Sequence, residues 1–151
     1  MEIRVDDPRR AAAVALLREH LADMALQSPP ESRHALDVDG LSGPFVTFWT
    51  GWDGDELVGC GALLELDPRH GEIKSMRTAR AHLRRGVATR LLRHIVDEAT
   101  RRRYVRLSLE TGSQEGFAPA RALYRQFGFI ECAPFGAYRS DPNSVFMTRA
   151  L

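Results

Sequence analysis

The sequence contains little lysine, little cysteine and no long hydrophobic segment. Lys74 is the only lysine among its 151 residues, so the Gly-Lys-Ser/Thr ending of a P-loop is absent. Cys60 and Cys132 are the only cysteines, and their spacing fits neither a metal site nor a disulfide framework. No apolar run is long enough to span a membrane, and the first residues lack the hydrophobic core of a signal peptide. We therefore expect a cytoplasmic protein without a membrane partner.

The chain also lacks an excess of charge of either sign. It carries 21 basic and 20 acidic residues, for a net charge of +1. This balance argues against a nucleic-acid partner, which would favour a strongly basic domain. We interpret the run at 101–103 as the solvated end of a helix, where cations oppose the negative pole of the helix dipole. The length of the chain and its 44% hydrophobic content predict a single globular domain spanning residues 1–151.

Hydrophobic periodicity and turn residues predict an α/β protein without repeats. The expected strands are 2–5, 45–50, 57–66, 72–78, 104–109, 129–132 and 144–151. The expected helices begin at Asp7–Pro8, after the loop at 83–88, and at about 117, with 110–115 as a polar loop. Because a helix separates strand 72–78 from strand 104–109, the two should be parallel neighbours. Residues 28–44 are irregular, and Ser32, Arg33 and His34 there face either a substrate or solvent.

The segment 83–88, Leu-Arg-Arg-Gly-Val-Ala, joins a strand to a long amphipathic helix. The first N–H groups of a helix have no partner within it, and Arg84 and Arg85 add charge suited to phosphate. Gly86 and Ala88 are small enough for a ligand to approach the backbone. These features predict a site for a pyrophosphate-bearing cofactor, and the alternative is an ordinary arginine-rich surface loop. A dinucleotide fingerprint is excluded, because it requires glycine at three places.

The order of elements, this basic loop and the run 122–129, Ala-Leu-Tyr-Arg-Gln-Phe-Gly-Phe, together resemble the GNAT superfamily of acetyl-CoA-dependent N-acetyltransferases. Segments 28–37, 109–112 and 134–138 also resemble a bacterial subgroup that acetylates small molecules or amino acids. The resemblance implies one domain, with a mixed sheet of about seven strands and helices on both faces. It also implies that strands four and five splay apart for the cofactor. Homodimers are common in this family.

The resemblance implies acetyl-CoA as co-substrate and no metal. The pyrophosphate would bind the backbone of 83–88, where Leu83 replaces the family's glutamine or arginine. The pantetheine arm would pair with the backbone of Met76 and Thr78, and the backbone near Arg77 would polarise the thioester carbonyl. The residues expected to contact the cofactor are Met76, Arg77, Thr78, Arg84, Arg85, Gly86, Val87, Ala88, Thr89, Ala120 and Leu123.

Two side chains are expected to move protons, because the acceptor amine must lose a proton and the leaving thiolate must gain one. Tyr124 matches the family's general acid, although its spacing alone also fits a core aromatic residue. Glu72 matches the position of a base in some members, and is otherwise an edge-strand carboxylate. His70, Glu65 and Glu110 are rival bases. The site itself can also disfavour the charged amine without any base.

The acceptor pocket is expected to involve Lys74, Glu110, Phe135, Tyr138 and Arg139. Lys74 alternates with Glu72 and Met76, which would place all three on one strand face. We interpret Cys60 as a packing residue and not as an acyl carrier.

The predicted function is acetyl transfer to a primary amine of a small molecule, by direct attack in a ternary complex. The alternative is a non-catalytic acyl-CoA-binding or sensor domain. If the protein is an enzyme, Tyr124→Phe should cut turnover with little loss of cofactor binding.

Overall fold

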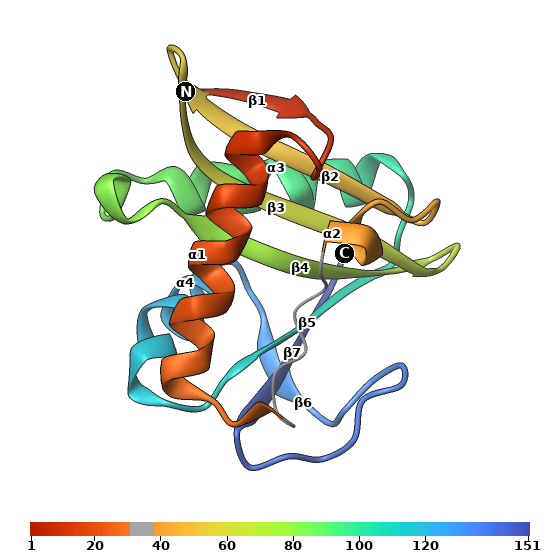
Figure 1. The fold of residues 1–151 in the computed structure, drawn as a ribbon. Coiled ribbons are helices and arrows are strands. Elements are labelled where there is room, and N and C mark those ends of the chain that lie inside the picture. The colour runs from red at the N-terminus through yellow and green to blue at the C-terminus, as the bar shows by residue number, and fades with distance from the viewer. Residues whose placement is uncertain (31–37) are drawn as a thin grey trace.

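A computed structural model describes residues 1–30 and 38–151, which form a seven-stranded sheet with helices on both faces (Figure 1). The candidates Ser32, Arg33 and His34 lie outside the described residues. The strands run in the order β1-β2-β3-β4-β5-β7-β6. Their bounds are β1 Glu2–Val5, β2 Val46–Asp53, β3 Glu56–Asp67, β4 His70–Thr78, β5 Arg106–Gly112, β6 Ile130–Cys132 and β7 Ser144–Ala150. The helices are α1 Ala11–Gln27, α2 Val38–Leu41, α3 Val87–Arg101 and α4 Ala118–Gln126, with short 3-10 turns η2 Arg80–His82 and η3 Glu115–Phe117.

The pairing of the strands confirms the predicted mixed sheet. Strands β2, β3 and β4 form an antiparallel meander, and β1 adds to its edge. Strands β4 and β5 are parallel neighbours, as the intervening α3 requires. Strand β7 then lies between β5 and β6 and is antiparallel to both.

The two faces of the sheet carry separate hydrophobic clusters. Leu16 and Leu17 of α1 pack with Leu41 of α2 and with Phe48 of β2 on one face. The other face is covered by α3 and α4, whose apolar side chains share a cluster that includes Ile95. Figure 1 shows α1 in front of the sheet and α3 behind it. The sheet therefore holds α1 and α4 on opposite sides of β4 and β5. Within the described residues, no helix is long and apolar enough to cross a membrane.

Two predicted boundaries were wrong. Helix α1 begins at Ala11 and not at Asp7–Pro8, because Asp7 caps a preceding turn. Its Oδ1 accepts a hydrogen bond from the Arg9 amide at 2.9 Å, and its carbonyl accepts one from the Arg10 amide at 3.0 Å. The start of the expected loop 110–115 is instead part of β5, because residues 110–112 pair with 144–146 of β7. This pairing gives the backbone N–H and C=O groups of residues 110–112 hydrogen-bond partners, although the side chains of this segment are typical of a loop.

Candidate active site between β4 and β5

A pocket lies where β4 and β5 separate. The strands pair at residues 70–73 and 106–109, and the last pair joins Ile73 to Leu109. Beyond it β4 continues to Thr78 and β5 to Gly112, so the predicted splay of the two strands is confirmed. The lining comes from α1 (His20, Met24), Ser28, β4 (Glu72, Ile73, Lys74, Ser75, Met76), β5 (Glu110, Thr111, Gly112), Phe117, α4 (Ala120, Tyr124), Tyr138 and Asn143.

A bulge in β4 changes which side chains face this pocket. The pairing register with β3 shifts by one residue here, and Ser75 has a φ of +54°. Because an extra residue reverses the alternation of side chains beyond it, Met76 packs with the cluster that contains Ile95. The prediction that Met76 shares a strand face with Glu72 and Lys74 is therefore wrong.

The same bulge turns the Arg77 side chain toward α1. Arg77 donates a hydrogen bond to Glu19 at 2.9 Å and another to Asp23, and Arg80 also pairs with Asp23. These ion pairs hold the end of β4 against α1. Nη2 of Arg77 is thus engaged with α1, while Nε of the same guanidinium is buried and has no hydrogen-bond partner among the described residues.

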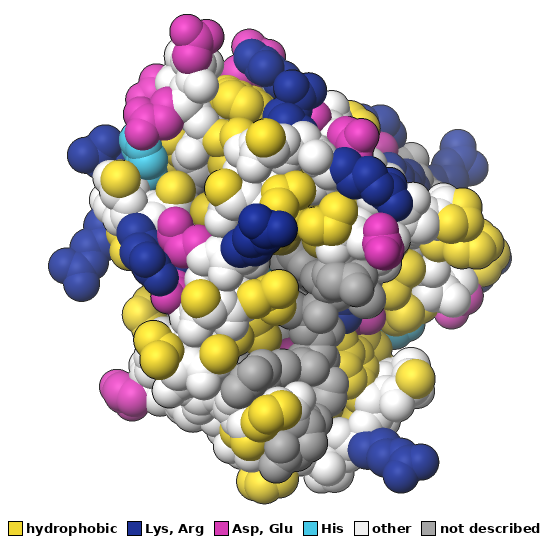
Figure 2. Space-filling view, viewed as in Figure 1, with side chains coloured by type: hydrophobic (Ala, Val, Ile, Leu, Met, Phe, Trp, Pro, Cys, Tyr) yellow, Lys and Arg dark blue, Asp and Glu magenta, His cyan; other side chains and the backbone are white. Residues whose placement is uncertain are grey.

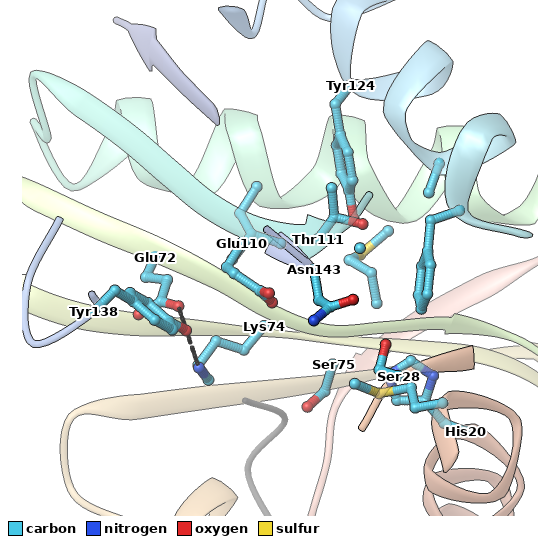
Figure 3. A pocket seen from close by; sticks show the side chains of 16 residues that line it. His20, Ser28, Glu72, Lys74, Ser75, Glu110, Thr111, Tyr124, Tyr138 and Asn143 are labelled. Atoms are coloured by element: carbon cyan, nitrogen blue, oxygen red, sulfur yellow. Dashed lines mark hydrogen bonds and ion pairs between the residues drawn. The ribbon is translucent and has the colours of Figure 1, made fainter. Parts of the chain in front are cut away.

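Three side chains from β4 and the loop before β7 form a closed hydrogen-bonded group. Tyr138 donates to Oε2 of Glu72 at 2.6 Å, and Lys74 donates to the same oxygen at 3.1 Å (Figure 3). Lys74 also donates to the Tyr138 hydroxyl at 2.8 Å. Burial, followed by the charge of Glu72, raises the pKa of Tyr138, so this phenol stays protonated. The Glu72 carboxylate is therefore neutralised by a buried ammonium and held by two donors.

Glu110 faces the pocket from β5 in different surroundings. Ser144 donates to its Oε2 at 2.6 Å. Burial raises the pKa of Glu110 to about 7, and the carboxylates of Glu72 and Asp141 act in the same direction, while Ser144 and Lys74 oppose them. A carboxyl group with this pKa can accept or release a proton near neutral pH.

Tyr124 points from α4 into the pocket, toward Thr111 and Asn143 (Figure 3). Burial raises its pKa, and the nearby charge of Glu110 raises it further, so the phenol keeps its proton at neutral pH. The ring packs edge-on against Phe129, with 5.9 Å between the ring centroids. This packing fixes the direction in which the hydroxyl points.

The wall formed by α1 and the bulge contains two polar groups that the sequence did not reveal. Nδ1 of His20 and Oγ of Ser75 are buried and have no hydrogen-bond partner among residues 1–30 and 38–151. Burial lowers the pKa of His20 to about 4, and the charge of Arg77 adds to this effect, so the imidazole is neutral. In the sequence, His20 lies four residues before Met24, and this helical spacing was the signal that could have placed both on one face of α1. The signal is weak, because histidine is not counted as apolar.

The basic loop lies at the N-terminus of α3, as predicted. Arg84 and Gly86 both have left-handed backbones, with φ of +63° and +80°. No side chain caps the helix, and its first internal bond runs from the Arg90 amide to the Gly86 carbonyl at 3.1 Å. Arg84 and Arg85 are exposed and form no ion pair with any other described residue. The loop therefore offers backbone donors and two guanidinium groups to an anion.

Comparison with known families identifies the chain. Residues 13–129 match the acetyltransferase (GNAT) family. The chain belongs to this family. It is 60% identical over 151 residues to YsnE, an uncharacterised N-acetyltransferase of Bacillus subtilis (strain 168), with 100% of both chains covered. It is also 36% identical over 150 residues to an IAA acetyltransferase of Azospirillum brasilense, covering 97% of this chain and 95% of the relative.

A solved structure shows the same fold together with coenzyme A. A Bacillus subtilis acetyltransferase in complex with CoA superposes with a TM-score of 0.69 at 19% identity, covering 99% of this chain and 98% of that one. The two chains thus share a fold, and the Bacillus subtilis structure holds CoA. Together with the family membership, the relatives establish that this chain is an N-acetyltransferase of the GNAT type.

The pocket brings together seven of the predicted site residues. Glu72, Lys74, Met76, Glu110, Ala120, Tyr124 and Tyr138 line the pocket. Phe135 instead packs against Tyr138 and Phe146, Leu123 packs with the core, and Arg139 is exposed and outside the lining.

The rival bases other than Glu110 lie outside the pocket lining. His70 shares a 2.7 Å hydrogen bond with Ser108, and Glu65 accepts one from Tyr104 at 2.9 Å. Cys60 is fully buried, and burial raises the pKa of its thiol to about 12, in keeping with a packing role. No cluster of metal-ligating side chains occurs within residues 1–30 and 38–151. On the face in Figure 2, basic side chains are scattered among acidic and hydrophobic ones.

Proposed function

We propose that this GNAT enzyme transfers the acetyl group of acetyl-CoA to a primary amine of a small molecule. The observation that carries this proposal is the pocket between the splayed strands, with the protonated phenol of Tyr124 directed into it. The gap leaves part of the β4 edge unpaired with β5, so the backbone of Met76 and Thr78 is available to an extended pantetheine arm.

The loop before α3 fits the pyrophosphate of the same ligand. The uncapped amides of Val87, Ala88 and Thr89 and the exposed guanidinium groups of Arg84 and Arg85 supply donors and positive charge. Leu83 removes one side-chain contact of the family pattern and leaves these donors in place. Ala120, which lines the pocket, would flank the arm from α4.

Proton transfer in the reaction requires a group that remains protonated until sulfur leaves. The buried phenol of Tyr124 meets this requirement, because its raised pKa keeps it protonated at neutral pH. We propose direct attack by the amine without an acyl-enzyme. Cys60 fits no acyl-carrier role, since a fully buried thiol with a pKa of about 12 is a poor nucleophile.

The acceptor would occupy the end of the pocket formed by Lys74, Tyr138 and Glu110. Phe135 supports the ring of Tyr138 from behind, with 5.1 Å between the ring centroids. Arg139 is exposed and directly follows Tyr138 in the sequence. It would therefore meet an acidic acceptor only at the entrance of the pocket. If Arg139 does so, Arg139→Ala should raise KM for acidic acceptors and leave KM for neutral amines unchanged.

Thermal unfolding with acetyl-CoA tests the cofactor, with ATP and NAD as controls. A ligand at one hundred times its Kd adds about 2.7 kcal/mol, which corresponds to roughly 5–10 °C for a domain of this size. CoA release is then measured with amino acids, polyamines, aminoglycosides and IAA, the compound in the name of the Azospirillum relative. Absence of a shift at millimolar acetyl-CoA would refute the proposed cofactor site.

A further inference from the structure

Glu72 and Glu110 are the two carboxylates in the described lining of the pocket, and their surroundings differ. Oε2 of Glu72 accepts hydrogen bonds from both Lys74 and Tyr138. Glu110 accepts one hydrogen bond, from Ser144, which leaves its other oxygen to a ligand. We infer that Glu110 is the base that takes a proton from the acceptor's ammonium, with Ser144 as its positioning residue. This inference rests on the proposed function.

The position of Glu110 in the sheet supports this role. It follows Leu109, the last residue of β5 that pairs with β4, so it lies where the gap opens. Figure 3 shows its carboxylate projecting from β5 into the space that Tyr124 reaches from α4. An amine bound between them would have a base on one side and the acid for the leaving group on the other.

The expected base, Glu72, is less suited to the task. Its negative charge is already balanced by Lys74, with 3.1 Å between Nζ and Oε2. Oε2 of Glu72 already accepts from two donors, and both side chains of the ion pair are less than one-tenth exposed, so little of this carboxylate is open to an acceptor amine. Glu72 therefore acts as an anchor for Lys74 and Tyr138, and it shapes the acceptor end of the pocket.

The charges around Glu110 suit proton uptake near neutral pH. The titratable groups that share its surroundings are Glu72 and Lys74 of β4, Tyr124 of α4, Tyr138 and Asp141 of the loop before β7, and neutral His20 of α1. Burial and the two neighbouring carboxylates disfavour the ionised form of Glu110, which brings its pKa to about 7. A base with such a pKa is still largely ionised at slightly alkaline pH and binds a proton readily.

These roles account for every proton in the reaction. The ammonium gives one proton to Glu110, and the free amine nitrogen then forms a bond to the acetyl carbon. The bond between that carbon and sulfur breaks, and Tyr124 gives its proton to the thiolate. The nitrogen loses a second proton as the amide forms, and this proton restores the Tyr124 phenol. Glu110 releases the first proton to solvent before the next turnover.

The test is the pH dependence of kcat/KM for wild type, Glu110→Gln, Glu72→Gln and Ser144→Ala, with an aliphatic amine that wild type acetylates. Wild type should show an ascending limb near pH 7, where Glu110 ionises. Glu110→Gln should lose this limb and roughly a hundredfold or more of kcat/KM, and its rate should instead follow ionisation of the amine itself. Ser144→Ala should move the limb to higher pH, because the lost hydrogen bond stabilises the ionised carboxylate.

The control variant Glu72→Gln should keep an ascending limb, moved to lower pH because the Glu72 carboxylate helps to raise the pKa of Glu110, even if KM for the acceptor rises. A limb that persists in Glu110→Gln but disappears in Glu72→Gln would overturn the inference and assign the base to Glu72. A limb that persists in both variants would overturn it as well. Binding of acetyl-CoA, measured by thermal shift, shows that each variant is folded. Failure of the proposed function is distinct, because wild type would then release no CoA with any amine.

Discussion

Removing the ionisable group at Glu110 should stabilise the folded protein above neutral pH. The pKa of this carboxyl is about 7 in the folded protein, compared with an ordinary value of 4.5. Since the folded pKa is raised, stability is fully present below pH 4.5 and is lost as the pH rises through 7. At 1.36 kcal/mol for each of the roughly 2.5 pH units between these values, the loss approaches about 3 kcal/mol at pH 8 and above.

The substitution Glu110→Gln isolates this effect, because glutamine has nearly the same shape and can still accept a hydrogen bond from Ser144. Urea unfolding of both proteins between pH 4.5 and 8.5 gives the difference in unfolding free energy at each pH. The unfolding free energy of the variant should exceed that of wild type by an amount that increases with pH. At pH 8 this excess corresponds to a gain in Tm of roughly 5–10 °C. Other titrating groups largely cancel, since both proteins contain them.

A difference that stays constant across this pH range would refute the reasoning, because Glu110 would then titrate alike in the folded and unfolded chains. The measurement needs neither acetyl-CoA nor an acceptor. It therefore examines the electrostatics of the pocket separately from catalysis. A variant that is both more stable and less active is the expected pattern where a functional group is buried at a cost in stability.

Four further substitutions test other parts of the site. Tyr124→Phe should lower kcat by about 10²–10⁴-fold with an unchanged thermal shift by acetyl-CoA, because it removes only the proton donor; equal loss of binding would contradict this role. Arg84→Ala and Arg85→Ala should each weaken acetyl-CoA binding roughly tenfold in calorimetry, through loss of a charge-assisted hydrogen bond. Gly112→Ala should cost about 1–3 kcal/mol in urea unfolding, since its Cβ would lie 2.2 Å from the ring of Phe117; an unchanged midpoint would show that the ring moves freely.

Local patterns were sufficient to predict most of the fold. The expected strands 45–50 and 57–66 correspond to β2 and β3, and the segment expected to be irregular from residue 28 begins directly after the end of α1 at Gln27. The parallel neighbours β4 and β5 followed from one helix between two strands. The start of α1 was predicted incorrectly, because Asp7 can cap either a helix or a turn and only the packed chain selects between them.

The placement of the basic loop at the start of α3 could be predicted, and its role in binding a cofactor stays a prediction. The basic loop and the start of α3 are adjacent in the chain, so their juxtaposition needs only a strand, a turn and a helix. The bulge at Ser75 escaped prediction, because it depends on the register between β3 and β4 and not on the residues of β4 alone. As a result, alternation along β4 placed Met76 on the wrong face.

What the sequence determined by itself was the order of the elements, the basic loop before α3 and the types of side chain available for proton transfer. These features depend on residues within a few positions of one another. Only the tertiary structure decided how the two carboxylates differ, since Tyr138 is 66 residues from Glu72 and Ser144 is 34 residues from Glu110. The pKa of a carboxyl group depends on its burial and on charges brought near it by folding, and neither is local in the sequence.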